Sequence, residues 1–329
     1  MATTLVFSII VPFLNEEEVL PETYRRLTGV MEKIGDPYEL LFVNDGSTDR
    51  SPDMVAELCA GDPRVRLLSL SRNFGQQAAT LAGMRHAEGQ ALVVIDADLQ
   101  DPPEVIASMA EKWRQGYHVV YGRREKRQGE TWFKKSTSRI FHRLLNALCD
   151  FSIPEDTGDF RLIDRKVRDV LCGLREHSLF FRGLVSWVGF RQTEISFVRE
   201  GRFAGETKYP FRKMFKLSVD AMTSFSYKPL RLASYLGFAL SGVSFLYLIR
   251  VFYEKFFTDH TVPGWSSLMS MSLFFHGVTL VILGILGEYV GRIYDEARDR
   301  PRYIVASTRG FPPRGGDPTP VGPEAPEAL

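Results

Sequence analysis

Over roughly the first 200 residues, short apolar runs rich in β-branched side chains alternate with longer stretches whose apolar residues recur at helical spacing. The runs predict strands, and the stretches between them predict helices. The expected strands are residues 5–13, 38–44, 65–70, 91–96 and 118–122, and the expected helices lie near residues 16–33, 49–59, 75–87 and 103–115. This alternation predicts an α/β fold with a mostly parallel sheet, whose ligand crevice lies beyond the carboxyl ends of the strands.

Two later segments have no such alternation. Eighteen uncharged residues lie between Arg231 and Arg250, and twenty-seven lie between His260 and Glu288, interrupted only by the ionisable His276. At 1.5 Å per residue, each is long enough to cross the ~30 Å hydrocarbon core of a bilayer as a helix. Two buried core helices are the alternative. We interpret His276 as a neutral side chain that hydrogen-bonds a neighbouring helix, since no second ionisable residue nearby completes a proton relay.

Basic residues flank both long segments. Lys213, Lys216, Lys228 and Arg231 precede the first, and Arg292, Arg298, Arg300 and Arg302 follow the second. The positive-inside rule then places both ends of the chain in the cytoplasm, so we expect a multi-pass protein of the inner (plasma) membrane. No signal peptide is expected, because the apolar run from Leu5 to Val11 has neither a basic region before it nor a cleavage site after it.

Composition narrows the class of protein. The 41 basic and 40 acidic residues give a net charge of +1, which argues against a nucleic-acid partner bound through bulk charge. A hydrophobic share of 44% excludes a wholly disordered chain. Cys59, Cys149 and Cys172 are too far apart in sequence for a zinc ribbon, a CxxC pair or a disulfide framework.

Polar turns follow the first three expected strands. They contain Asn15 with Glu16, Asn44 with Asp45, and Asn73 with Gly75. Each turn opens an expected helix, so Asn15, Asp49 and Asn73 are also good candidates for helix caps. Three polar turns at one edge of a sheet nevertheless favour a nucleotide pocket, because carboxylate and amide groups can bind a base edge and ribose hydroxyls.

The fourth strand ends in two carboxylates, Asp96 and Asp98. Hard oxygen ligands of this kind suit Mg²⁺ or Mn²⁺ bridging a diphosphate. An EF-hand loop does not fit, because its glycine and its final glutamate are missing. A DxDxT phosphotransferase motif does not fit either, because Gln100 stands where threonine belongs. A purely structural turn remains an alternative.

Together these motifs resemble a known family. VPFLNEEE, VNDGSTD, SRNFGQ and DADLQDPPE, followed by TGDFRL and by GRFAGETKY before paired spans, are similar to the inverting family-two glycosyltransferases of GT-A fold. Within that family they resemble the polyprenyl-phosphate branch, which includes dolichol-phosphate mannose synthases and bactoprenol glucosyltransferases. The resemblance extends over about residues 5 to 305.

The resemblance implies roles for individual residues. It implies that Pro12, Asn15, Glu16 and Asp45 contact the nucleoside. It also implies that Asp96, Asp98 and Gln100 surround the metal and the diphosphate, and that Asp159 lies near the sugar and the acceptor. Many members have two acidic residues where this chain has Asn44 and Asp45, which leaves the choice between UDP and GDP open. No Q-x-x-R-W motif of processive synthases occurs, so a single transfer is expected.

Two basic segments suggest where the acceptor binds. Residues 123–143 hold eight basic and two acidic residues, a local charge of +6, and from residue 131 their apolar residues have helical spacing. This pattern predicts a basic amphipathic helix on an anionic membrane, although an ordinary solvated helix face is the alternative. Arg123, Lys135 and Arg139 are its candidate ligands for the acceptor phosphate. In a later glycine-punctuated loop, Arg202 and Lys208 are candidates for the acceptor phosphate or the leaving diphosphate.

The sequence therefore predicts a metal-dependent, membrane-anchored enzyme that moves one sugar from a nucleotide diphosphate sugar, UDP-glucose for example, to undecaprenyl phosphate. Asp98, Asp159, Arg202 and Lys208 are its expected catalytic residues, and Mg²⁺ or Mn²⁺ its cofactor. Membrane lipids, a separate flippase and a second copy of the chain are the partners considered. The alternatives are a non-catalytic sensor or scaffold that binds nucleotide sugar or polyprenyl phosphate, and a GT-A transferase with a protein or glycan acceptor.

The expected organisation has five parts. A cytoplasmic GT-A catalytic domain occupies residues 1–210, followed by an interfacial helix at 211–230. A transmembrane hairpin at 231–288 leads to a cytoplasmic segment at 289–309, and the Pro- and Gly-rich residues 310–329 form a disordered tail.

Overall fold

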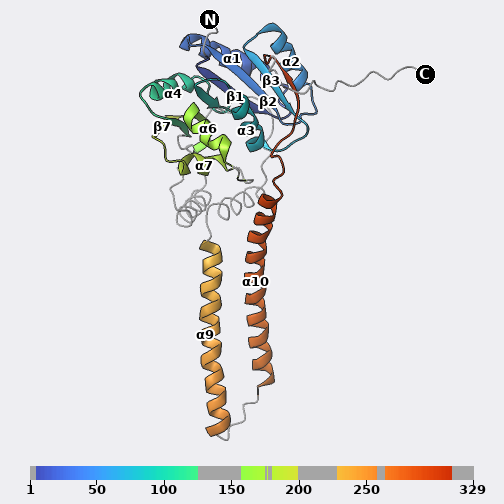
Figure 1. Cartoon of the computed structure of the whole chain (residues 1–329), viewed down its shortest axis with the longest axis vertical. Coiled ribbons are helices and arrows are strands. Elements are labelled where there is room, and N and C mark those ends of the chain that lie inside the picture. The colour runs from blue at the N-terminus through green and yellow to red at the C-terminus, as the bar shows by residue number, and fades with distance from the viewer. Residues whose placement is uncertain are drawn as a thin grey trace, which may run out of the picture. The chain divides into compact units, whose positions relative to one another are not determined.

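The structure is a computed structural model that describes residues 5–124, 157–174, 176, 180–198, 228–257 and 264–312. These residues form two compact units. One unit contains the sheet, the helices that pack on it and the strand after the last long helix, whereas the other contains the two long helices (Figure 1).

In the described residues the first unit has a mixed sheet of order β7-β5-β6-β4-β1-β2-β3-β8. Its strands are β1 (Phe7–Phe13), β2 (Tyr38–Asn44), β3 (Val65–Leu70), β4 (Ala91–Val94), β5 (Val119–Arg124), β6 (Thr157–Asp164), β7 (Gln192–Phe197) and β8 (Val305–Arg309). Strands β3, β2, β1 and β4 are mutually parallel, while β6 runs antiparallel between β4 and β5, and β8 runs antiparallel to β3. This is the predicted GT-A architecture.

Six described helices belong to this unit. They are α1 (Leu20–Ile34), α2 (Ser51–Gly61), α3 (Gln76–His86), α4 (Val105–Arg114), α6 (Arg165–Gly173) and α7 (Phe181–Trp187). The five strands and four helices predicted from the sequence are all present, whereas β6, β7, β8, α6 and α7 were not predicted.

The central strand β1 has apolar side chains on both faces, because helices cover both. Phe7, Ile9 and Val11 alternate along one face and belong to a core with residues of α1, α2 and α4, such as Leu27. On the other face, Gly83 of α3 lies against Ile10 so closely that a Cβ on Gly83 would be 2.4 Å from Ile10 Cγ2. Helix α3 therefore packs directly on β1.

Strand β8 comes from the far end of the chain and covers the β3 edge of the sheet. Its register with β3 runs from Leu67↔Arg309 to Leu70↔Val305. Phe311 follows it and packs against the guanidinium of Arg66, 5.3 Å from the ring centroid, and edge-on against His86. Residues 305–311 therefore belong to the unit that contains the sheet, whereas we expected residues 289–309 to form a juxtamembrane segment and residues 310–329 a tail. The rest of the predicted tail, from residue 313, lies outside the described residues.

The second unit contains α9 (Lys228–Phe257) and α10 (Trp265–Ala297), which contact each other and lie side by side (Figure 1). In the described part of the chain, one segment is long and apolar enough to cross a membrane, Phe274–Ala297 in α10, and it is not buried by protein. Helix α9 has a shorter apolar stretch, Gly237–Tyr247. His276 Nδ1 lies 2.7 Å from the carbonyl oxygen of Ser272, so the hydrogen bond given by the described side chains is within its own helix, whereas we expected one to the neighbouring helix.

Candidate active site

The loops after β1 and β2 are joined by hydrogen bonds. The amide of Asn15 donates to Ser47 Oγ (3.0 Å), the amide of Thr48 donates to Asn15 Oδ1 (2.8 Å), and the amide of Glu16 donates to Ser51 Oγ (2.9 Å). Asn15 has a left-handed backbone (φ 54°), which asparagine tolerates better than most residues. Asn15 and Glu16, both predicted nucleoside ligands, therefore lie against the loop that begins with Asp45.

The alternative interpretation of these polar residues as helix caps holds for Asp49, whose Oδ1 accepts from the amide of Ser51, the first residue of α2 (3.1 Å). Helices α1, α2 and α3 begin after Val19, Arg50 and Gly75, and none of the three has a side-chain cap at that position. Asn15 instead joins two loops, because its Oδ1 accepts from the amide of Thr48.

Asp45 is 4% exposed and uses both of its carboxylate oxygens on the loop after β3. Oδ1 accepts from the amide of Phe74 (2.8 Å), and Oδ2 accepts from the amide of Gly75 (3.0 Å). Burial raises the pKa of Asp45, and these two amides together with Arg72 only partly oppose the effect. Pro12 lies nearby in β1, buried and opposite Val43.

The Asp96–Asp101 turn gathers acidic side chains at the end of β4. The amide of Gln100 donates to Asp98 Oδ1 (3.2 Å), around Leu99 with its left-handed backbone (φ 55°). Burial, followed by the charges of Asp159, Asp98 and Asp101, raises the pKa of Asp96 to about 7. A bound cation would relieve this accumulation of negative charge.

Asp101 is 1% exposed and forms a two-point ion pair with Arg124, whose Nε and Nη2 donate at 3.2 and 3.0 Å. Gly158 leaves room for this guanidinium, because a Cβ there would lie 2.7 Å from Arg124 Nη2.

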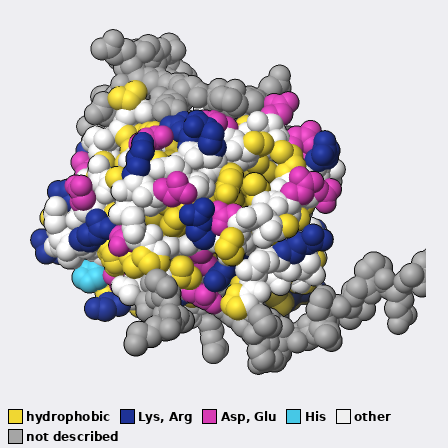
Figure 2. Space-filling model, turned by 90° about the horizontal axis from the view of Figure 1, so that it is seen from above, with side chains coloured by type: hydrophobic (Ala, Val, Ile, Leu, Met, Phe, Trp, Pro, Cys, Tyr) yellow, Lys and Arg dark blue, Asp and Glu magenta, His cyan; other side chains and the backbone are white. Residues whose placement is uncertain are grey.

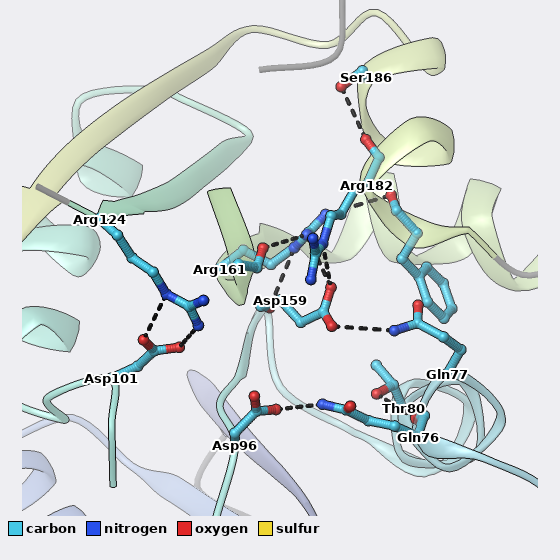
Figure 3. Close-up of polar contacts among 12 residues, drawn as sticks. Gln76, Gln77, Thr80, Asp96, Asp101, Arg124, Asp159, Arg161, Arg182 and Ser186 are labelled. Carbon is cyan, nitrogen blue, oxygen red and sulfur yellow. Dashed lines mark hydrogen bonds and ion pairs between the residues drawn. The ribbon is translucent and has the colours of Figure 1, made fainter. Parts of the chain in front are cut away.

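Asp159 reaches the site through the antiparallel strand β6. The β4–β6 register ends at Val94↔Arg161, and its continuation by two residues brings Asp159 opposite Asp96. Gln77 Nε2 donates to Asp159 Oδ2 (3.2 Å), and Arg182 Nε donates to Oδ1 (3.1 Å) (Figure 3). Burial opposes ionisation of Asp159, but Arg182 and Arg161 outweigh it and lower the pKa of this carboxyl.

Arg161 is itself buried, with Nη2 3.6 Å from Asp159 Oδ1 and 2.9 Å from the carbonyl oxygen of Gly158. Burial lowers its pKa to about 10. Together, Arg161, Arg182 and Asp159 form an ion cluster beside Asp96.

The donor set suits a divalent cation held jointly with a substrate. In the described residues, no group of three or more His, Cys, Asp or Glu side chains could hold a metal by itself. Mg²⁺ is typically held by one or two carboxylates together with substrate phosphates, and Asp96 and Asp98 supply two such groups from one turn.

Of the predicted acceptor ligands, Arg123 is described, and its Nη1 lies 2.9 Å from Glu194 Oε1. The other candidates, Lys135, Arg139, Arg202 and Lys208, lie outside the described residues.

Two family models match the chain. The model of glycosyl transferase family 2 matches residues 8–171, and the model of the GtrB C-terminal hairpin matches residues 228–293. A glycosyltransferase of Bacillus subtilis (strain 168) is 58% identical, covering 94% of this chain and 96% of the relative. The chain belongs to glycosyl transferase family 2. The family assignment covers the loops that contain Asn15, Asp45, Asp96 and Asp159.

Further relatives of this family 2 glycosyltransferase are similar over their full length. A glycosyltransferase of Synechocystis is 42% identical over 94% of this chain and 97% of the relative. The SfII prophage-derived bactoprenol glucosyl transferase of Shigella flexneri is 40% identical over 93% of this chain and 99% of the relative. The similarity therefore includes both the catalytic unit and the helical unit.

Several residues around the site of this glycosyltransferase were missed by the sequence analysis. They are Gln76, Gln77, Asp101, Arg124, Arg161 and Arg182. One signal was available, because Asp159 and Arg161 are two positions apart and so share a face if TGDFRL is a strand. Gln76 and Asp101 also stand in the motifs SRNFGQ and DADLQDPPE, and Arg124 in the basic segment 123–143, but no such role was assigned to them. Nothing local marks Gln77 and Arg182.

Proposed function

We propose that this glycosyltransferase moves one glucosyl unit from UDP-glucose to undecaprenyl phosphate at the cytoplasmic face of the membrane. The main support is the similarity to bactoprenol glucosyl transferases, which extends at 38–40% identity over 91–93% of this chain. That similarity spans both the sheet and the C-terminal hairpin. It therefore supports the lipid acceptor and the membrane anchor together.

The donor nucleotide would lie across the carboxyl ends of β1, β2 and β4, where open α/β sheets bind ligands. Pro12, Asn15, Glu16 and Asp45 would contact the nucleoside, and Asp96, Asp98 and Gln100 the diphosphate and its metal. The interlocked loops around Asn15 support this assignment, since they put these groups at one edge of the sheet.

In the reaction, an acceptor phosphate oxygen attacks the anomeric carbon while the bond from that carbon to the nucleoside diphosphate breaks. A phosphate monoester has a second pKa near ~6, so its oxygen is already anionic and no strong general base is required. Catalysis then depends on positioning and charge stabilisation. In-line displacement inverts the configuration, so an α-linked donor gives a β-linked lipid product.

Asp96 and Asp98 would hold Mg²⁺ or Mn²⁺, which supplies charge stabilisation for the departing diphosphate. Asp159 is ionised and firmly held, which suits it to orient a sugar hydroxyl or the acceptor. Arg202 and Lys208, with Arg123, Lys135 and Arg139, would bind the acceptor or leaving phosphates.

Helices α9 and α10 would span the inner membrane as a hairpin, with the catalytic domain and both termini in the cytoplasm. The hairpin family model over residues 228–293 and the apolar segment Phe274–Ala297 support this topology. Two spans are few for moving the product across a bilayer, so a separate flippase would follow, and a second copy of the chain would be a further partner.

The decisive experiment measures transfer of labelled sugar from a panel of UDP- and GDP-sugars into an organic-extractable product. It uses purified full-length protein, undecaprenyl phosphate and Mn²⁺, with EDTA and Asp98→Asn as controls. We expect product from UDP-glucose only, and a loss of at least about 100-fold in either control, because several kcal/mol of charge stabilisation disappear. A lipid product formed equally well in EDTA, or none from any donor, would refute the proposal.

A further inference from the structure

Four consecutive residues, 74–77, bind three carboxylates that come from three different strands. The amides of Phe74 and Gly75 donate to Asp45, which follows β2. The next two residues donate through their side-chain Nε2 atoms. Gln76 donates to Oδ1 of Asp96, which follows β4, and Gln77 donates to Oδ2 of Asp159, which lies in β6 (Figure 3). One short run therefore connects the expected nucleoside, metal and sugar sites.

The start of α3 explains how neighbours reach different partners. Successive helical side chains are turned by about 100° around the axis, so Gln76 and Gln77 point to Asp96 and Asp159 respectively (Figure 3). Gly75 precedes them with φ 96°, a conformation that L side chains rarely adopt. The close contact of Gly83 with Ile10 holds α3 against the sheet, and hence fixes both glutamines.

The chemistry of the amide matters as much as its position. A glutamine N–H fixes the orientation of a carboxylate but leaves its negative charge intact, whereas a lysine would partly neutralise it. Asp96 shares its turn with Asp98 and Asp101, and the β4–β6 register brings Asp159 opposite it. A neutral donor does not compete with a cation for the charge of Asp96.

We propose that Gln76 and Gln77 are positioning residues for the transfer reaction, Gln76 orienting Asp96 toward the metal and Gln77 orienting Asp159 toward the sugar or acceptor. The inference rests on the proposed function and assigns roles to two residues that the family motifs leave undefined. Hydrogen-bonding partners that orient metal ligands typically contribute 10- to 100-fold to metal affinity or activity.

The test replaces each glutamine with methionine, which has a similar shape but no amide. Gln90→Met is the matched control, since Gln90 is exposed and lies outside the site. Mn²⁺ affinity is measured by electron paramagnetic resonance with saturating UDP present, since the proposed site holds the cation jointly with the diphosphate, and no turnover is needed. We expect Gln76→Met to weaken Mn²⁺ binding about 10-fold or more, and Gln77→Met and Gln90→Met to leave it within about twofold of wild type.

The second arm measures kcat of the full-length enzyme in a double-mutant cycle. Gln77→Met should lower kcat about 10- to 100-fold in the wild type, the effect of losing a hydrogen bond to a charged group, but less than about twofold in an Asp159→Asn background. If Gln77 had a purely structural role, the two substitutions would act independently, and the kcat of the double variant would fall by the product of the two single effects.

The outcomes separate the two proposals. If the wild type transfers no sugar, the proposed function fails, and the Mn²⁺ measurement alone decides the positioning role. If the wild type is active, the proposed function stands. Unchanged Mn²⁺ affinity in Gln76→Met then overturns the positioning role of Gln76, and independent losses of kcat in the double-mutant cycle overturn that of Gln77.

Discussion

Asp159→Asn tests the ion cluster as a structural element separately from its role in catalysis. The substitution keeps the shape of the side chain but removes the charge that compensates Arg161, whose side chain is 5% exposed. Removing one partner of a buried ion pair costs about 3–5 kcal/mol. We expect the free energy of unfolding to fall by about 3 kcal/mol, the lower end of this range. Arg161 keeps its hydrogen bond to the carbonyl oxygen of Gly158, and the Arg182 side chain is 38% exposed to water.

The assay is thermal unfolding of the full-length protein in detergent. For a domain of this size, a loss of about 3 kcal/mol lowers the Tm by about 6–12 °C. The matched control is Asp36→Asn, which removes the partner of Arg114 in an ion pair whose side chains are 32% and 48% exposed. Exposed pairs contribute less than about 1 kcal/mol, so the control should unfold within a few degrees of wild type.

Acid provides an independent check with a defined sign. The pKa of Asp159 is lowered by folding, so its contribution to stability is complete above the unfolded-state pKa of about 3.9 and declines as the pH falls through the folded-state value. The Tm difference between wild type and Asp159→Asn should therefore shrink below about pH 4. A Tm change no larger than that of Asp36→Asn at pH 7, or a difference that persists in acid, would refute the argument.

Three further predictions follow from the packing and the loops. Gly83→Ala should destabilise the protein by about 1–3 kcal/mol, because the new Cβ would lie 2.4 Å from Ile10 Cγ2. Gly29→Ala should instead stabilise the protein by up to about 1 kcal/mol, because the space around Gly29 is open. Equal Tm values for the two variants would contradict this packing. Asp45→Asn should weaken UDP binding about 10-fold in calorimetry, because the amide cannot accept from both Phe74 and Gly75; wild-type affinity would show that this loop is not needed for the nucleotide. Arg124→Met should destabilise the protein by about 3 kcal/mol in the same Tm assay, because it leaves Asp101 buried and unpaired. An unchanged Tm would mean that this ion pair contributes little to stability.

The described surface carries charged side chains of both signs. Basic and acidic side chains are interspersed on the face that Figure 2 shows, in agreement with a net charge of +1.

Sequence patterns were sufficient for β1, β2 and β4 because each is a mostly apolar run buried at every position. They were also sufficient for β3 and β5, whose apolar residues are buried or partly buried although arginines interrupt or end the run. They failed for β6, where Asp159 and Arg161 break the apolar pattern, and for β8, whose five residues are mostly exposed. Their pairing with β4 and β3 depends on contacts that local periodicity does not encode.

The same distinction applies to the site. Asp45, Asp96, Asp98 and Asp159 stand in recognisable motifs, so their positions at the sheet edge could be predicted. Gln76 and Gln77 look like ordinary first-turn helix residues, and their partners are 20 and 82 positions away. Only the packing of α3 on β1 reveals them.

The pairing of β8 with β3 has a consequence for biosynthesis. A ribosome makes residue 305 long after residue 70, by roughly 10–50 s at about 5–20 residues per second, and the hairpin of α9 and α10 is made in between. Throughout that interval the β3 edge has open backbone donors and acceptors, which can pair with another chain. The nascent sheet therefore needs protection until residue 305 has been made, and a chain truncated before residue 305 would keep that unpaired edge permanently.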